Sequence, residues 1–201
     1  MLLAKNITLH RSKRIIFNDI SISLSSGKII MLKGKNGSGK TSFLKTILSL
    51  LEPTSGSLYW KGKALSKSLY DYYNNVTYIA DKTSSIREIS VHENIKIWKK
   101  IFLSQINYNQ IKDILTVLNL ENFLNTRVST LSLGEIKKLE LLRLIIENKK
   151  IWILDEPLTN LDEHSINVIG QTFTDHCKND GCIIFSSHQD LNILVTEEIN
   201  L

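Results

Sequence analysis

The chain has 201 residues, 42% of them hydrophobic, which is enough for one domain of ordinary size, with room for an inserted lobe. Its net charge of +5 favours an anionic partner, but the lysines are scattered with little aromatic interleaving, which favours a solvated surface over a nucleic-acid stripe. No apolar run approaches the ~20 residues that span a membrane, and the N-terminus lacks the apolar region of a signal peptide, so we expect a soluble, cytoplasmic protein.

The first part of the chain is predicted to be rich in strands. Apolar alternation or short apolar runs predict strands at residues 2–9, 20–24, 29–32, 58–60 and 76–79. A polar, basic turn from His10 to Arg14 separates the first two strands. Apolar residues at helical spacing from Phe43 to Leu51 predict a helix after the third strand.

The remaining segments alternate between helices and strands. From about Ser84 to Thr130 glycine and proline vanish and helical spacing takes over, which predicts a small helical lobe inserted in the core. Residues 132–146 predict an amphipathic helix, and the runs 151–154 and 182–185 are typical of buried parallel strands. This alternation predicts an α/β fold.

A glycine-rich loop follows the strand 29–32. Residues 34–41 match the phosphate-binding pattern G-x-x-x-x-G-K-[ST], between a strand and a helix as the pattern requires. Glycines let the backbone N–H groups approach a polyphosphate, and the helix N-terminus favours the same anion. Lys40 would reach the β- and γ-phosphates, and the Thr41 hydroxyl would hold Mg²⁺. We therefore predict an ATP site formed by Gly34, Lys35, Asn36, Gly37, Ser38, Gly39, Lys40, Thr41 and Ser42.

Two acids end the apolar run 151–154. At the carboxyl end of a buried strand, Asp155 would lie beside the glycine-rich loop and support Mg²⁺, and Glu156 would act as the general base toward the attacking water. The alternative is a strand that ends in acids by chance, which the upstream loop disfavours.

A further motif lies at residues 131–135, Leu-Ser-Leu-Gly-Glu. Ser132 and Glu135 have the spacing of a capping box, and a serine and a glycine at a helix start also suit an anion. Here the chain resembles the ATP-binding subunits of ABC transporters, whose signature is Leu-Ser-Gly-Gly-Gln. The resemblance extends over essentially the whole chain, through the glycine-rich loop, the strand ending in Glu156, the segment 159–162 and the switch histidine, His188.

The resemblance implies a fold and an assembly. The expected fold is a P-loop NTPase core with an N-terminal antiparallel β subdomain and an inserted α-helical subdomain: a single domain, 1–201, with core 1–82 and 131–201 and helical subdomain 83–130. Two copies would sandwich two ATP molecules head to tail. Ser132, Gly134 and Asp162 are then ATP contacts, the first two toward ATP held by the partner copy, and His188 senses the γ-phosphate.

The resemblance also implies partners. A membrane-embedded transporter subunit would dock in a groove around residues 82–94, and the chain would work as a peripheral subunit on the cytoplasmic face of the membrane. No nucleic acid and no direct heme contact are expected.

Within the family, the chain is most similar to the ATP-binding subunit of the heme exporter of cytochrome c maturation. The likeness rests on residues 39–42, 152–159 and 187–191. It implies that ATP drives heme export or release of a heme-loaded chaperone. Two alternatives stay open: the ATPase subunit of another small transporter, and a nucleotide-gated module that barely hydrolyses ATP.

Three positions depart from the family pattern. Lys82, preceded by Asp81, stands where a glutamine normally meets Mg²⁺ and the attacking water, so we expect Lys82 to point away and Asp81 to be the alternative oxygen donor. Leu133 replaces a glycine of the signature. Arg11 stands near the place of the aromatic residue that stacks on adenine, and we predict it as a nucleotide contact because a guanidinium can also stack on a base. The alternative is an ordinary surface arginine.

Only two cysteines occur, Cys177 and Cys182. His176 and His188 lie nearby in the sequence, but the spacing fits no zinc pattern. We expect two buried thiols.

Overall fold

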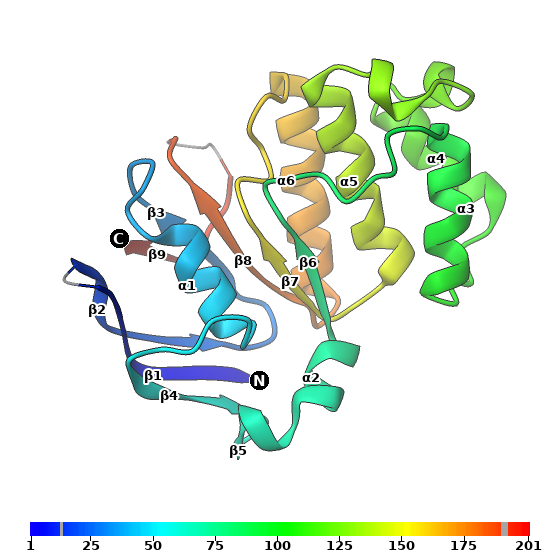
Figure 1. Cartoon of the computed structure of the whole chain (residues 1–201). Coiled ribbons are helices and arrows are strands. Elements are labelled where there is room, and N and C mark those ends of the chain that lie inside the picture. The colour runs from blue at the N-terminus through cyan, green and yellow to red at the C-terminus, as the bar shows by residue number, and fades with distance from the viewer. Residues whose placement is uncertain (13, 190–192) are drawn as a thin grey trace.

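The structure is a computed structural model that describes residues 1–12, 14–189 and 193–201 (Figure 1). Asp190 and Leu191, part of the segment 187–191 noted above, lie outside the described residues. The strands are β1 Leu2–Arg11, β2 Arg14–Leu24, β3 Ile29–Lys33, β4 Ser55–Trp60, β5 Lys63–Ala64, β6 Val76–Ile79, β7 Ile151–Leu154, β8 Cys182–Ser187 and β9 Glu197–Asn200. The α-helices are α1 Lys40–Ile47, α2 Leu69–Asn74, α3 Val91–Ile101, α4 Tyr108–Val117, α5 Leu133–Glu147 and α6 Glu163–Lys178. Short 3₁₀ turns lie at Leu65–Lys67, Glu121–Phe123 and Val128–Thr130.

The N-terminal strands form an antiparallel sheet in the order β2-β1-β4-β5. The pairing of β1 with β2 runs from Leu2 opposite Leu24 to Arg11 opposite Arg14. The predicted turn from His10 to Arg14 is therefore too long, because His10 and Arg11 still take part in the ladder. Backbone pairing continues here past the point where apolar alternation stops.

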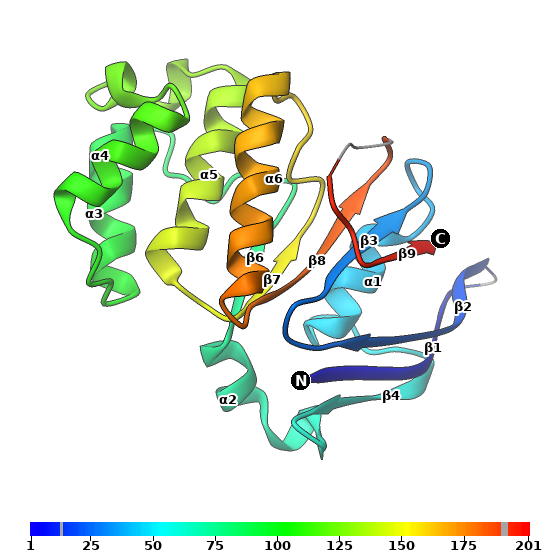
Figure 2. The ribbon, with the colours of Figure 1, turned by 180° about the vertical axis from the view of Figure 1, so that it is seen from behind.

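The second sheet is parallel, in the order β6-β7-β8-β3-β9, and its inner strands β7, β8 and β3 are buried on both faces. Successive residues of one strand enter different cores: Ile30 packs toward α1 and the antiparallel sheet, whereas Met31 packs toward α5 and α6. Figure 2 shows α5 and α6 covering that second face. Burial on both faces explains why β3, β7 and β8 read as continuous apolar runs.

Helix α1 begins directly after the glycine-rich loop and fills the space between the two sheets (Figure 1). It is shorter than the predicted helix, because Leu48 caps it and Ser49 adopts a left-handed φ of 57°. Leu51 consequently lies outside the helix and is 36% exposed.

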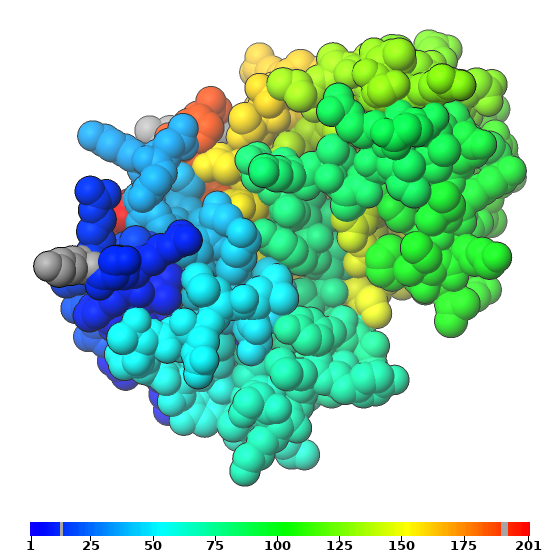
Figure 3. All heavy atoms as spheres, viewed as in Figure 1, coloured from blue at the N-terminus to red at the C-terminus, as the bar shows by residue number. Residues whose placement is uncertain are grey.

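The helical lobe contains α3 and α4, each opened by a capping box, at Ser90 and Asn107 respectively. Its core is a separate apolar cluster that includes Leu139 and Leu142 of α5. Figure 3 shows the lobe, in green, as a projection beside the rest of the molecule. Helix α5 thus joins the lobe to the parallel sheet. None of the described helices is long and apolar enough to cross a membrane.

Candidate active site

The glycine-rich loop between β3 and α1 borders an open cavity of about 540 Å³. Gly37 and Gly39 have φ of 84° and 107°, a region that strongly favours glycine, and a Cβ at Gly39 would come within 2.7 Å of Ile16. Five other segments meet the loop here, so residues far apart in the sequence share one cavity. Its lining residues are Arg11, Ile16, Asn36, Gly37, Gly39, Lys40, Thr41, Ser42, Asp81, Glu156, Thr159 and His188.

Lys40 lies in the floor of this loop and is 6% exposed. Its Nζ donates to the carbonyl oxygens of Gly34 at 2.7 Å and of Lys35 at 3.3 Å. The same Nζ lies 3.2 Å from Oε1 of Glu156. The ammonium is therefore held where the loop converges, as phosphate recognition requires.

Asp155 directly follows β7 and is 1% exposed. Its carboxylate accepts hydrogen bonds from the hydroxyls of Thr41 and Ser186, each at 2.7 Å. One carboxylate and one hydroxyl suit Mg²⁺, which keeps several waters and binds through one or two protein oxygens together with substrate phosphates. This donor set fits the predicted metal site.

Glu156 adopts a left-handed φ of 48°, which is unusual for a glutamate. Its N–H donates to Ser186 Oγ at 2.8 Å, which fixes the turn. The carboxylate lies 2.9 Å from His188 Nδ1 and accepts from Thr159 Oγ1 at 3.2 Å. Backbone strain of this kind is retained where surrounding contacts impose it, often at functional sites.

The structure separates Asp81 from Lys82. Asp81 lines the cavity, whereas Lys82 is not among its lining residues and is exposed, as expected for a lysine that points away. Asp81 Oδ1 lies 3.8 Å from Nζ of Lys137. An oxygen donor therefore borders the cavity although the glutamine is missing.

Arg11 also lines the cavity, at the end of β1. Apart from the His188 imidazole, no aromatic side chain is among the described lining residues, so stacking on a base would fall to the Arg11 guanidinium. Ile16 and Thr159 also line the cavity, although neither was predicted as a nucleotide contact. Ile16 carries no local signal, whereas Thr159 begins the segment 159–162 that is part of the family resemblance.

The remaining loop residues support the loop and are not among those that line the cavity. Lys35 accepts from the N–H of Ser38 at 3.1 Å, and the buried hydroxyl of Ser38 has no partner among the described residues. Gly34 is closely packed, since a Cβ there would meet the Leu201 carbonyl at 2.6 Å.

The signature residues lie elsewhere and do not line this cavity. Ser132 and Glu135 form the predicted capping box at the start of α5, while Leu133 is 68% exposed. A Cβ at Gly134 would meet the Asn160 carbonyl at 2.6 Å, so the 159–162 segment packs against the signature. Asp162 caps α6 through Ser165 and lies 2.9 Å from Nζ of Lys138.

Cys177 and Cys182 are buried free thiols, as expected. His176 stacks on Trp152 with ring centroids 3.6 Å apart, and its burial lowers its pKa to about 4. Across the described residues there is no group of three or more His, Cys, Asp or Glu side chains placed to hold a metal.

Comparison with known families decides the class of protein. Residues 17–159 match the family model described as ABC transporter, and this range covers most of the chain. The chain belongs to the ABC transporter family. The family and the fold predicted from the motifs are thereby confirmed.

Several curated relatives of this ABC protein carry one name, cytochrome c biogenesis ATP-binding export protein CcmA. The protein from Reclinomonas americana is 38% identical over 94% of this chain and 87% of its own length. Those from Aliivibrio fischeri and Vibrio vulnificus strain YJ016 are 32% and 31% identical, over 96% and 95% of this chain and 94% and 93% of their own lengths.

Solved structures show the same fold. A putative ABC transporter ATP-binding protein from Pyrococcus furiosus superposes with a TM-score of 0.85 at 25% identity, over 100% of this chain and 96% of that one. An ATP-binding subunit of an ABC transporter gives a TM-score of 0.79 at 21% identity, over 93% of this chain and 79% of that one.

Membership in this family makes the chain a nucleotide-binding subunit that hydrolyses ATP. ABC ATP-binding subunits generally dimerise and pair with membrane subunits. The roles of individual site residues stay predictions.

Proposed function

We propose that this chain hydrolyses Mg²⁺-ATP to power an export step of c-type cytochrome biogenesis, in which heme leaves the cytoplasm or a heme-loaded chaperone is released. The observation that carries the export assignment is the name shared by relatives that match nearly the full chain. The ATP-binding subunit of another small transporter is the alternative.

The arrangement of the cavity supports a separate role in hydrolysis for each of its charged and polar residues. Lys40 would bind the β- and γ-phosphates, and Thr41 and Asp155 would hold Mg²⁺, which would supply neutralisation of the phosphate charge. Glu156 accepts a proton from the attacking water, and His188, 2.9 Å from it, orients that carboxylate and senses the γ-phosphate.

The position of the signature supports a dimer. Ser132 and Gly134 lie outside the cavity of their own chain, and Leu133 between them is exposed. We propose that a second copy docks head to tail, so that each signature meets the ATP held by the other copy. The division into core 1–82 and 131–201 and helical subdomain 83–130 belongs to the same proposal.

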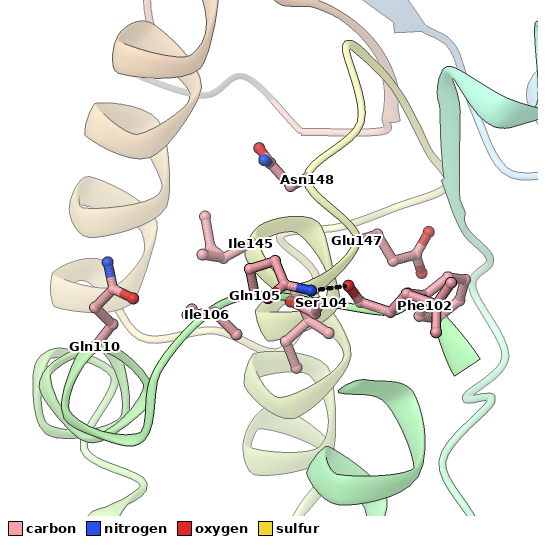
Figure 4. Close-up of a pocket in the computed structure, with 10 residues that line it drawn as sticks. Phe102, Ser104, Gln105, Ile106, Gln110, Ile145, Glu147 and Asn148 are labelled. Atoms are coloured by element: carbon pink, nitrogen blue, oxygen red, sulfur yellow. Dashed lines mark hydrogen bonds between the residues drawn. The ribbon is translucent and has the colours of Figure 1, made fainter. Parts of the chain in front are cut away.

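A second cavity, of about 490 Å³, is a candidate docking site for the membrane subunit. It lies between the α3–α4 connection and the C-terminal end of α5, with Phe102, Ile106 and Ile145 beside Gln105 and Gln110 (Figure 4). We propose this groove in addition to the predicted one around residues 82–94, where Lys82, Ile86 and Arg87 are exposed and remain available to a partner. The chain would thus be a peripheral subunit on the cytoplasmic face of the membrane.

Heme staining of c-type cytochromes in the source cell carrying Lys40→Ala tests the export assignment. Loss of covalently attached heme, with the variant protein at normal abundance, is the expected result. Normal heme attachment would contradict the assignment while leaving the ATPase in place for another transporter.

A weakly hydrolysing, nucleotide-gated module is a second candidate because Lys82 stands in the place of the usual glutamine. Measured turnover separates the two: the gated module predicts equal slow rates for wild type and Glu156→Gln.

A further inference from the structure

Helix α5 carries two buried charged side chains that face the loop 81–85. Lys137 and Glu140 are three residues apart, hence on one face of the helix, and they are 7% and 2% exposed. Charged groups are rarely this buried unless they are paired or hydrogen-bonded. Both find their partners in the segment that follows β6.

Glu140 binds three consecutive residues of that loop. Its carboxylate accepts from Thr83 Oγ1 at 2.6 Å, from the N–H groups of Ser84 at 2.9 Å and Ser85 at 2.7 Å, and from the Ser84 and Ser85 hydroxyls. Burial by itself raises the pKa of Glu140, but the hydrogen bonds from Ser85, Thr83 and Ser84 outweigh it and leave the pKa below its ordinary value. The charged carboxylate is thus the form that the loop stabilises.

Lys137 holds the other end of the same loop. Its Nζ lies 3.5 Å from the Asp81 carbonyl oxygen and 3.8 Å from Oδ1 of Asp81. The Asp81 side chain is 65% exposed and borders the nucleotide cavity together with Lys40 and Glu156. Because residues 80–89 form no helix or strand, the place of Asp81 depends on what fixes this loop.

We propose that Glu140 is a positioning residue for ATP hydrolysis. By accepting hydrogen bonds from residues 83–85, it keeps Asp81 at the edge of the nucleotide cavity. Asp81 then offers an oxygen at the reacting end of the nucleotide, where the family glutamine is missing. This inference rests on the assignment of ATP hydrolysis to that cavity.

A purely structural role for Glu140 is the alternative, and α5 offers a matched control. Glu147 is also a buried carboxylate, 8% exposed, that accepts hydrogen bonds from Arg143 and, at 2.9 Å, from Thr77. Among the described residues, Glu147 makes no hydrogen bond or ion pair with residues 83–85, and it reaches them through Arg143, whose Nη1 donates to the Ser84 hydroxyl at 2.7 Å. Replacing either acid by glutamine removes a buried charge beside Arg143, but only Glu140→Gln turns an amide donor toward the N–H groups of Ser84 and Ser85.

The first test is a double-mutant cycle on steady-state ATPase kinetics with Glu140→Gln, Asp81→Asn, the double variant and Glu147→Gln. We expect Glu140→Gln and Asp81→Asn each to lower kcat about fivefold with little change in KM, and the double variant to be no slower than Asp81→Asn alone. Glu147→Gln should keep kcat within about twofold. Three outcomes would overturn the proposal. The kcat losses of Glu140→Gln and Asp81→Asn could multiply in the double variant, Glu147→Gln could lose as much kcat as Glu140→Gln, or Asp81→Asn could keep the full kcat.

A second measurement does not depend on activity. Amide hydrogen exchange of residues 80–86 should accelerate in Glu140→Gln and stay at the wild-type rate in Glu147→Gln. If Glu140→Gln does not fold, Thr83→Val serves instead, because it removes one hydrogen-bond donor to Glu140 at an exposed position. We expect it to lower kcat and to accelerate the exchange of residues 80–86, each less than Glu140→Gln would. In the Asp81→Asn background it should leave kcat unchanged. Unchanged exchange would overturn the proposal. A wild type that hydrolyses no ATP would instead refute the proposed function itself.

Discussion

His188 Nδ1 lies 2.9 Å from Oε2 of Glu156, although 32 residues separate the two in the sequence. Because β7 and β8 are parallel neighbours, their carboxyl ends bring the acid and the imidazole to the same edge of the sheet. Lys40 approaches the other carboxylate oxygen at 3.2 Å. The Glu156 carboxylate is thereby fixed between the His188 imidazole and the Lys40 ammonium.

Replacing His188 by alanine should slow hydrolysis without abolishing nucleotide binding. The imidazole orients the Glu156 carboxylate, while Lys40 and the glycine-rich loop still hold the phosphates. We expect kcat to fall about 100-fold, a typical loss for a positioned acid–base partner, with ATP affinity within about threefold of wild type. Phosphate release and equilibrium ATP binding measure the two quantities, and a loss confined to binding would contradict the role.

Thr41→Ala should raise the Mg²⁺ concentration that half-saturates hydrolysis. The Thr41 hydroxyl is one of two protein oxygens offered to the metal, and its removal also leaves Asp155 one donor short. Titration of the ATPase rate with Mg²⁺ at saturating ATP measures this, with Thr46→Ala in the same helix as the control because the Thr46 hydroxyl donates to the Ser42 carbonyl and Thr46 is not among the residues that line the cavity. Removal of Mg²⁺ by a chelator should stop both variants.

Gly134→Ala should destabilise the contact between the signature and the segment 159–162. The new Cβ would lie 2.6 Å from a backbone oxygen of Asn160, so the segment has to move. We expect a loss of about 1–3 kcal/mol in the free energy of unfolding together with weaker ATPase activity. Leu133→Ala at the neighbouring exposed position should change stability by less than about 0.5 kcal/mol, and equal stability of the two variants would argue against this packing.

Stability should fall as the pH is lowered from about 6.5 toward about 4 because of His176. Burial lowers its pKa to about 4 in the folded chain, whereas the unfolded chain binds the proton near pH 6.5. Between these values the unfolded state binds more protons, so acid favours unfolding. Denaturant unfolding of His176→Gln should show a flatter pH dependence than wild type, and His164→Gln, an exposed site on the same helix, should not.

The strands of the parallel sheet could be predicted because burial on both faces leaves a continuous apolar run, as in β3 and β8. Strand β9 could not, since Glu197–Asn200 is a half-exposed edge that, among the described strands, pairs with β3 alone. Helix α6 had usable signals, an Asp162 cap and apolar residues at helical spacing, that were not used.

The glycine-rich loop and the acids after β7 were predictable because a short, local stretch of sequence is enough to recognise each of them. The anchoring of Asp81 was not. It depends on Lys137 and Glu140, which reach the loop 81–85 only once α5 packs beside β6. No local pattern in the sequence signals such a long-range contact.

The most direct test of ATP hydrolysis at this site is phosphate release from Mg²⁺-ATP by wild type and Glu156→Gln, with Glu163→Gln on the surface of α6 as control. We expect Glu156→Gln to release phosphate at least about 100-fold more slowly while still binding ATP, because the amide cannot take the proton of water. The Glu163→Gln rate should match wild type. Equal rates for wild type and Glu156→Gln would contradict the assignment of Glu156 as the base.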